Sequence, residues 1–100
     1  MFPTRELLAS AERLLERDRV HQLLIDAHPE LEDRIEVDDA KPLLTIPTGR
    51  GGAIILWNSK HEGTIRWRMA VPGGDGVTVL EPNSIEDLPG LVAGRLGASA

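Results

Sequence analysis

The chain has 100 residues, of which 41% are hydrophobic and 27% charged, and its formal net charge is −5. This length suits one domain, and this composition is ordinary for a globular protein, which argues against disorder. Cysteine is absent, which excludes disulfides, thiolate metal sites and thiol nucleophiles. The apolar runs are far shorter than the roughly 20 residues of a membrane-spanning helix. The first residues also lack the basic-then-apolar pattern of an export signal, so we expect a cytoplasmic protein without membrane contact.

The charge is unevenly distributed along the chain. Residues 1–40 contain eleven acids and five arginines, whereas residues 41–80 contain five basic residues and two acids. An acidic part and a basic part can attract each other within one fold, or the basic part can meet an anionic partner. Both interpretations stay open from composition alone.

The first predicted element is an amphipathic helix over residues 4–28. Thr4 suits the N-cap position, and apolar residues then recur three and four positions apart. Pro29 disfavours helical geometry at His28 and therefore ends the helix. Because the apolar stripe is long for so small a domain, we predict that its first part binds a protein partner or a second copy of the chain. The predicted contact residues are Leu7, Leu8, Ala11, Leu14 and Leu15.

An antiparallel sheet is predicted over residues 35–80, where β-branched and long apolar residues alternate with glycine, proline and aspartate turn signals. Its strands are expected at residues 35–37, 43–46, 53–58, 64–71 and 77–80. Residues 53–57 are apolar on both sides of their strand. Both helices could cover one face of the sheet, or one helix could cover each face; the second arrangement would explain why this strand is apolar on both sides.

The register of the hairpin between residues 53–58 and 64–71 depends on the length of its loop. A five-residue loop sets Trp57 opposite Ile65, whereas a two-residue turn sets Trp57 beside Arg68. We predict the first register, because it produces one coherent apolar face. It gathers Ile55, Trp57, Ile65, Trp67, Met69, Val71, Val77 and Val79 on that face and leaves Ile54 and Leu56 beside Arg66 and Arg68 on the other.

A short second helix is predicted over residues 84–96, with Ser84 as its N-cap; Pro89 lies inside the pattern and allows for two pieces. The segment VTVLEPNSI (residues 77–85) resembles the C-terminal end of WYL-domain transcriptional regulators, where a strand ending in Leu-Glu-Pro leads into the last helix. The resemblance covers about twenty residues with the helix included. The preceding residues depart from that family, which has a helix where a strand is predicted here.

Catalytic and metal sites are not indicated by the sequence. His21 and His28 are seven residues apart and lack a third ligand at zinc spacing. The acids at residues 30–33 and 38–39 lie in polar segments, where the raised pKa of an acid catalyst is not expected. The glycine-rich residues 48–52 match no phosphate-loop pattern, and no serine has a nucleophile-elbow context. We therefore expect no enzymatic activity, no cofactor and no bound metal.

A hairpin that bears arginine and tryptophan is the alternative functional feature. A sheet that presents aromatic rings and basic side chains can stack bases and contact phosphates. Because alternate residues of a strand point to opposite faces, Trp67 and its arginine neighbours do not share a face, which weakens this interpretation. The candidate residues are Arg50, Lys60, Arg66, Arg68 and Trp57.

Taken together, these patterns predict a single α+β domain, an antiparallel β-meander of three to five strands flanked by an N-terminal amphipathic helix and a short C-terminal helix. The preferred function is a non-enzymatic protein-binding adaptor or regulator that self-associates, as a homodimer, through its N-terminal helix. Nucleic-acid binding is the alternative, and an enzyme ranks third.

Overall fold

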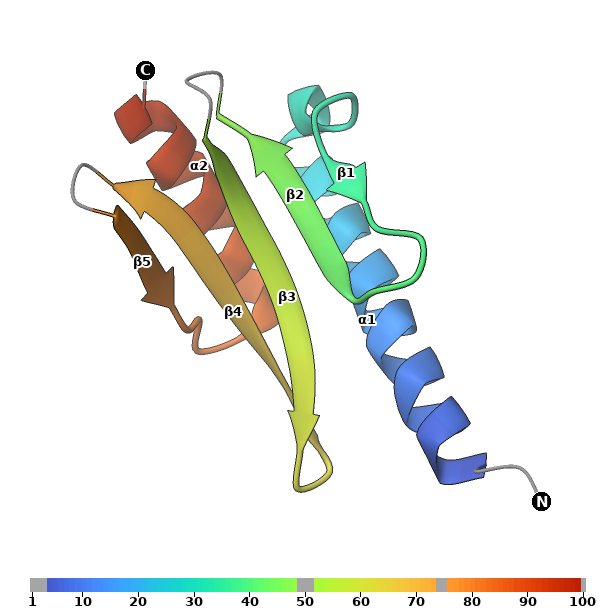
Figure 1. Cartoon of the computed structure of the whole chain (residues 1–100). Helices are drawn as coiled ribbons and strands as arrows, with labels where there is room; N and C mark the ends of the chain where they lie inside the picture. The colour runs from blue at the N-terminus through green and yellow to red at the C-terminus, as the bar shows by residue number, and fades with distance from the viewer. Residues whose placement is uncertain (1–3, 49–51, 74–75, 100) are drawn as a thin grey trace.

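The computed structural model describes the backbone of residues 4–48, 52–73 and 76–99 and the side chains of residues 11–48, 52–73 and 76–96. The chain has an N-terminal helix, a five-stranded antiparallel sheet and a short C-terminal helix, as Figure 1 shows. The predicted α+β class and the predicted order of elements are confirmed.

Helix α1 (Thr4–Ala27) runs without interruption and ends where the proline predicts. His28 has non-helical backbone angles, and a 3-10 turn, η1 (Pro29–Leu31), follows it. Val20 and Leu24, one turn apart, are fully buried and fix the side of the helix that packs on the sheet. Within the described residues, none of the helices has the length and apolar character needed to cross a membrane.

The sheet is a simple meander in which each strand pairs antiparallel with the next, in the order β1-β2-β3-β4-β5. Its strands are β1 (Glu36–Val37), β2 (Leu43–Pro47), β3 (Ala53–His61), β4 (Thr64–Gly73) and β5 (Gly76–Leu80). Strands β3 and β4 are the longest, and their residues pair up to the turn that joins them. The edge strand β1 is only two residues long.

The C-terminal segment forms two pieces, the 3-10 turn η2 (Ile85–Asp87) and helix α2 (Leu88–Ser99). Ser84 stands in extended conformation directly before η2, at the predicted N-cap position. Its side chain makes no capping hydrogen bond, and its carbonyl instead accepts a bond from the Asp87 amide at 3.2 Å.

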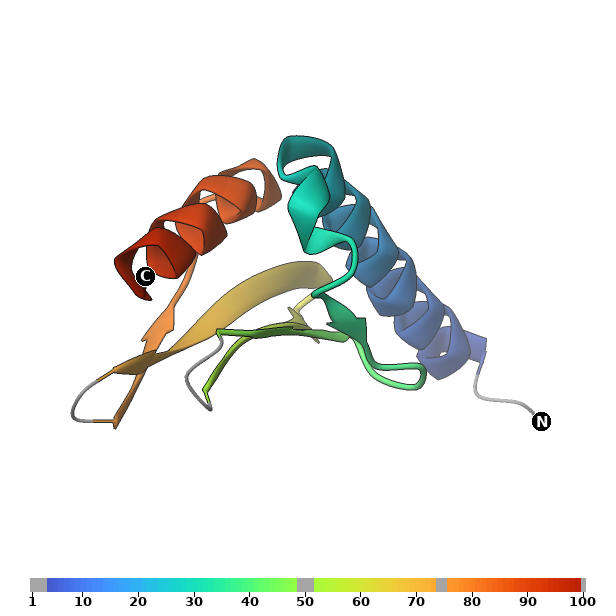
Figure 2. The same cartoon turned by 90° about the horizontal axis from the view of Figure 1, so that it is seen from above.

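Both helices lie on the same face of the sheet (Figure 2). Val20 of α1 and Leu88 and Val92 of α2 belong to one buried cluster together with the strand residues that point to that side. The sequence leaves two arrangements open, and the structure has the one with both helices on the same face. Residues 53–57 are apolar on both sides because the second face of the sheet is apolar too, although no part of the chain that the structure describes covers it.

The hairpin between β3 and β4 is tighter than predicted. Only Glu62 and Gly63 lie between the paired residues His61 and Thr64. Both turn residues have positive φ angles, 51° and 81°, as in a type I′ turn, whose twist matches that of the strands on either side. The strands therefore continue through residues 59–61, and the predicted five-residue loop is wrong.

This register exchanges the predicted faces. Trp57 lies opposite Arg68, and Leu56 lies opposite Met69. The covered face, which packs on the helices, contains Ile54, Leu56, Ile65, Trp67, Met69 and Val71, whereas the other face contains Ile55, Trp57, Arg66, Arg68, Val77 and Val79. The prediction grouped Trp57 with Trp67, and Ile54 and Leu56 with the arginines, and both groupings are wrong. The two-residue turn pairs the odd-numbered residues of β3 with the even-numbered residues of β4, so each side chain of β3 shares a face with the other set of β4 side chains.

Asn58 is a polar residue buried on the covered face, with 1% of its surface exposed. Its side-chain amide donates to the carbonyl of Arg13 at 3.1 Å, and Nη2 of Arg13 donates to the carbonyl of Asn58 at 3.1 Å. Buried polar groups destabilise a fold unless they are hydrogen-bonded. This reciprocal contact therefore holds the middle of α1 at one position along β3.

Candidate functional site

The open face of the sheet, which points away from α1 and α2, carries aligned rows of mostly apolar side chains. Antiparallel pairing places one row across all five strands and a second row beside it. The rows are Glu36, Thr45, Ile55, Ala70 and Val79, then Leu43, Trp57 and Arg68, with the pairs Pro47–Ala53 and Pro72–Val77 beyond the first row. At the spacing of paired strands and of alternate residues, the patch measures roughly 400 Å².

Several apolar side chains of the open face contact solvent. Val77 and Val79 are 69% and 55% exposed, and Ile55 and Trp57 are only partly buried. An antiparallel sheet with one face on the core usually places polar residues on its solvated face. The open face departs from that pattern, and an apolar patch of this size commonly marks an interaction surface.

The predicted basic residues do not form one group. Arg68 lies on the open face opposite Trp57, and Arg66 lies on the same face but pairs with Glu81 at 3.6 Å. Lys60 points to the covered side, where its Nζ contacts Glu12 of α1 at 2.6 Å. Arg50 lies outside the described residues.

The predicted helix surface is described only in part. Ala11 and Leu15, one turn apart, are exposed, and 68% of the Leu15 surface is accessible to solvent. Leu14 is half-buried beside the segment between β1 and β2. The side chains of Leu7 and Leu8 lie outside the described residues.

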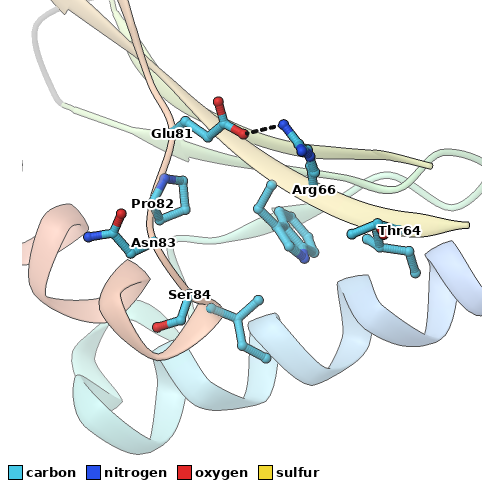
Figure 3. Close-up of a pocket in the computed structure, with 9 residues that line it drawn as sticks. Thr64, Arg66, Glu81, Pro82, Asn83 and Ser84 are labelled. Atoms are coloured by element: carbon cyan, nitrogen blue, oxygen red, sulfur yellow. Dashed lines mark ion pairs between the residues drawn. The ribbon is translucent and has the colours of Figure 1, made fainter. Parts of the chain in front are cut away.

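A cavity of about 460 Å³ lies where β5 ends and the chain turns toward the helices. Figure 3 shows Glu81, Pro82, Asn83 and Ser84 on one side and β4 on the other, with an ion pair between Glu81 and Arg66. Trp67, on β4, also lines the cavity and is 4% exposed. Its indole Nε1–H is buried and has no hydrogen-bond partner among the described residues.

The titratable groups singled out from the sequence lie apart from one another. His28 is 3.7 Å from Glu30 at the end of α1, whereas His61 lies beside the exposed β3–β4 turn. His21 is half-buried on α1. Within the described part of the chain, no group of three or more histidine, aspartate or glutamate side chains has an arrangement that could hold a metal ion.

Asp38 organises the connection between β1 and β2. Its Oδ1 accepts hydrogen bonds from the amides of Ala40 and Lys41, both at 2.9 Å, and these bonds lower the pKa of the carboxyl below its ordinary value. The carbonyl of Asp38 accepts a bond from the guanidinium of Arg17 on α1. The acid identified in the sequence therefore has a structural role in this turn.

The open face as a whole was missed by the sequence analysis. Two signals pointed to it: the dipeptide Glu62–Gly63, which suits a two-residue turn, and the run of residues 53–57, which is apolar on both sides. The cavity beside Trp67 had no signal in the sequence, because its position depends on where β5 stops pairing with β4.

No protein-family model, curated protein or solved structure matches this chain. The segment that resembles WYL-domain regulators is a strand followed by a 3-10 turn, and residues 64–73 before it form strand β4. The likeness is therefore limited to the strand-to-helix junction.

Proposed function

We propose that this protein is a non-enzymatic protein-binding module, an adaptor or regulator, that docks its partner through the open face of the sheet. The observation that carries the proposal is the apolar composition of that face around Ile55 and Trp57. A patch of roughly 400 Å² on each partner corresponds to roughly 800 Å² buried in total, which is at the low end for specific protein–protein interfaces. Weak, reversible binding is therefore expected, as suits a regulator.

The shape of the open face indicates the kind of partner. A twisted sheet packs well on another sheet of the same twist, at a distance of about 10 Å. Arg68 stands at the side of the apolar rows and makes no ion pair with another described residue. We therefore expect a partner with an apolar sheet surface and an acidic group at its border.

Nucleic-acid binding is the second candidate, and one observation favours it. Trp57 lies directly opposite Arg68 on the open face, so an aromatic ring and a cation are adjacent there. The protein-binding proposal is preferred because Arg66 is paired with Glu81 and Lys60 with Glu12, and because the whole chain is acidic.

The N-terminal helix remains a second candidate surface for self-association. Its support is the exposed pair Ala11 and Leu15 on one side of α1. A helix that packs on the sheet along one side can contact a second copy along another.

Photo-crosslinking tests which surface binds. A benzoylphenylalanine is placed at position 57 in the cells that produce the protein, and adducts are identified by mass spectrometry. Position 15 reports on the helix surface, and position 26, an exposed polar site of α1, is the matched control. We expect a protein adduct at position 57 and none at position 26.

The adduct mass separates the candidates. A mass of two chains identifies a second copy, and any other protein mass identifies a different partner; both support docking through the open face. A nucleic-acid adduct at position 57 supports the second candidate instead. An adduct only at position 15, or none at position 57, contradicts the proposal.

A further inference from the structure

Strand β4 has a free edge beside the cavity. Strand β5 pairs with β4 from Gly73 and Gly76 to Met69 and Leu80 and goes no further. Strand β4 itself continues to Thr64, so its first residues, 64–68, pair on one side only, with β3. Such an edge presents unpaired backbone donors and acceptors to any extended chain that reaches it.

The pairing pattern tells which backbone groups face the edge. Around a two-residue turn, the Thr64 amide bonds to the His61 carbonyl, so Thr64 faces β3. Backbone groups of an antiparallel strand alternate in direction, so those of Ile65 and Trp67 face the β5 side. Neither residue has a hydrogen bond on that side to any residue that the structure describes.

The end of β5 has a physical cause. The residue that would come opposite Trp67, if β5 continued, is Pro82, which has no amide proton to donate. The chain leaves the sheet there and borders the cavity from the other side, as Figure 3 shows for Pro82, Asn83 and Ser84. The result is a slot between the β4 edge and this linker.

Trp67, which lines the slot, also has a polar group without a partner. The indole Nε1–H of Trp67 is buried and unbonded within the described residues, although Trp67 lines the cavity. A buried donor without an acceptor is destabilising, so an acceptor supplied from outside would be favourable there. Two independent features, the strand edge and the indole, thus lie on the same residue.

We propose that this slot binds an extended segment of another polypeptide by strand addition to β4. The segment exchanges backbone hydrogen bonds with Ile65 and Trp67, where β5 would lie if it continued, and offers a side-chain oxygen to the Trp67 indole. The ion pair of Arg66 and Glu81 borders the slot and places a charge of each sign beside the bound segment. This site is separate from the open face and does not depend on the function proposed for it.

Nuclear magnetic resonance tests the edge in the free protein. In hydrogen exchange, we expect the amides of Ile65 and Trp67 to exchange about tenfold or more faster than those of Arg66 and Arg68, which pair with β3. Equal protection of all four amides would mean that the edge is already paired, and would overturn the proposal.

A peptide with the sequence of residues 77–81, VTVLE, serves as the probe, acetylated and amidated, because this sequence pairs with β4 further along. The control peptide carries N-methyl groups on alternate amides and cannot add as a strand. We expect VTVLE at millimolar concentration to slow exchange at Ile65 and Trp67 and to shift the Trp67 indole signal, with no effect of the control.

The variant Trp67→Phe removes the indole donor and keeps the strand edge. We expect it to weaken peptide binding about fivefold, the loss of one hydrogen bond, while the amide of Ile65 is still protected. No shift with VTVLE, or the same shift with the N-methylated control, contradicts strand addition. An unchanged affinity in Trp67→Phe contradicts the role of the indole.

Discussion

Both faces of the sheet carry apolar side chains, but in opposite environments. On the covered face, Ile54, Leu56 and Met69 are fully buried beneath the two helices. On the open face, Ile55 and Trp57 occupy alternate positions of the same strand and remain partly exposed. Hydrophobicity therefore does not by itself identify the core of a small sheet domain, because residues of the same kind also lie on its open face.

The largest expected difference between the faces comes from two neighbouring isoleucines of β3. Ile54→Ala removes a fully buried side chain and should lower the free energy of unfolding by about 2–5 kcal/mol. Ile55→Ala deletes the same atoms from the open face and should cost about 1 kcal/mol. Urea unfolding of both variants measures the two free energies of unfolding. Equal decreases in the two variants would contradict the difference between the faces.

A second matched pair compares polar neighbours. Asn58→Ala removes the side-chain amide that donates to the Arg13 carbonyl and accepts from Arg13 Nε, keeps the backbone carbonyl that accepts from Arg13 Nη2, and should cost about 1–3 kcal/mol of stability. Ser59→Ala, on the open face, should change stability by less than about 0.5 kcal/mol. If thermal unfolding found Asn58→Ala as mild as Ser59→Ala, the contact between α1 and β3 would not stabilise the fold as described.

The turn that decides the faces provides a third test. Gly63 has a φ of +81°, and a new Cβ there would meet no atom within 4 Å, so Gly63→Ala costs only backbone strain, about 1–2 kcal/mol. Gly90→Ala is the control, because Gly90 is helical with equally open surroundings and alanine should stabilise α2 by about 0.5–1 kcal/mol. Opposite signs are expected in chemical denaturation; a neutral Gly63→Ala would contradict the positive-φ turn.

The smallest expected effect is on the stability of the protein at low pH. The pKa of Asp38 is lowered in the fold, so its contribution to stability is complete above the ordinary value of 3.8 and is lost as the pH falls through the lower, folded pKa. Asp38→Asn keeps an acceptor for the two amides but does not titrate. We expect its thermal midpoint to fall less than that of the wild type between about pH 5 and about pH 2.5. If the thermal midpoints of the wild type and of Asp38→Asn fell equally with pH, the Asp38 carboxylate would not contribute to stability.

The elements of this fold were predictable because their signals are local. The stripe of α1, the stop at Pro29 and the turn residues after Val71 depend on near neighbours in sequence, and the structure confirms the class and order they predicted. The register was not predictable from apolarity, because residues 53–57 satisfy either parity and the turn alone decides between them. The position of the helices depends on packing between distant segments, such as Arg13 with Asn58.

The central claim is that Trp57 and Trp67 lie on opposite faces of the sheet, one open and one covered. Acrylamide quenching of two single-tryptophan variants, Trp67→Phe and Trp57→Phe, tests it most directly at a dilution that favours the free chain. We predict strong quenching and red-shifted emission for Trp57, with weak quenching and blue-shifted emission for Trp67, which is 4% exposed. Equal protection of the two rings in the dilute, folded protein would contradict the register and, with it, the open face.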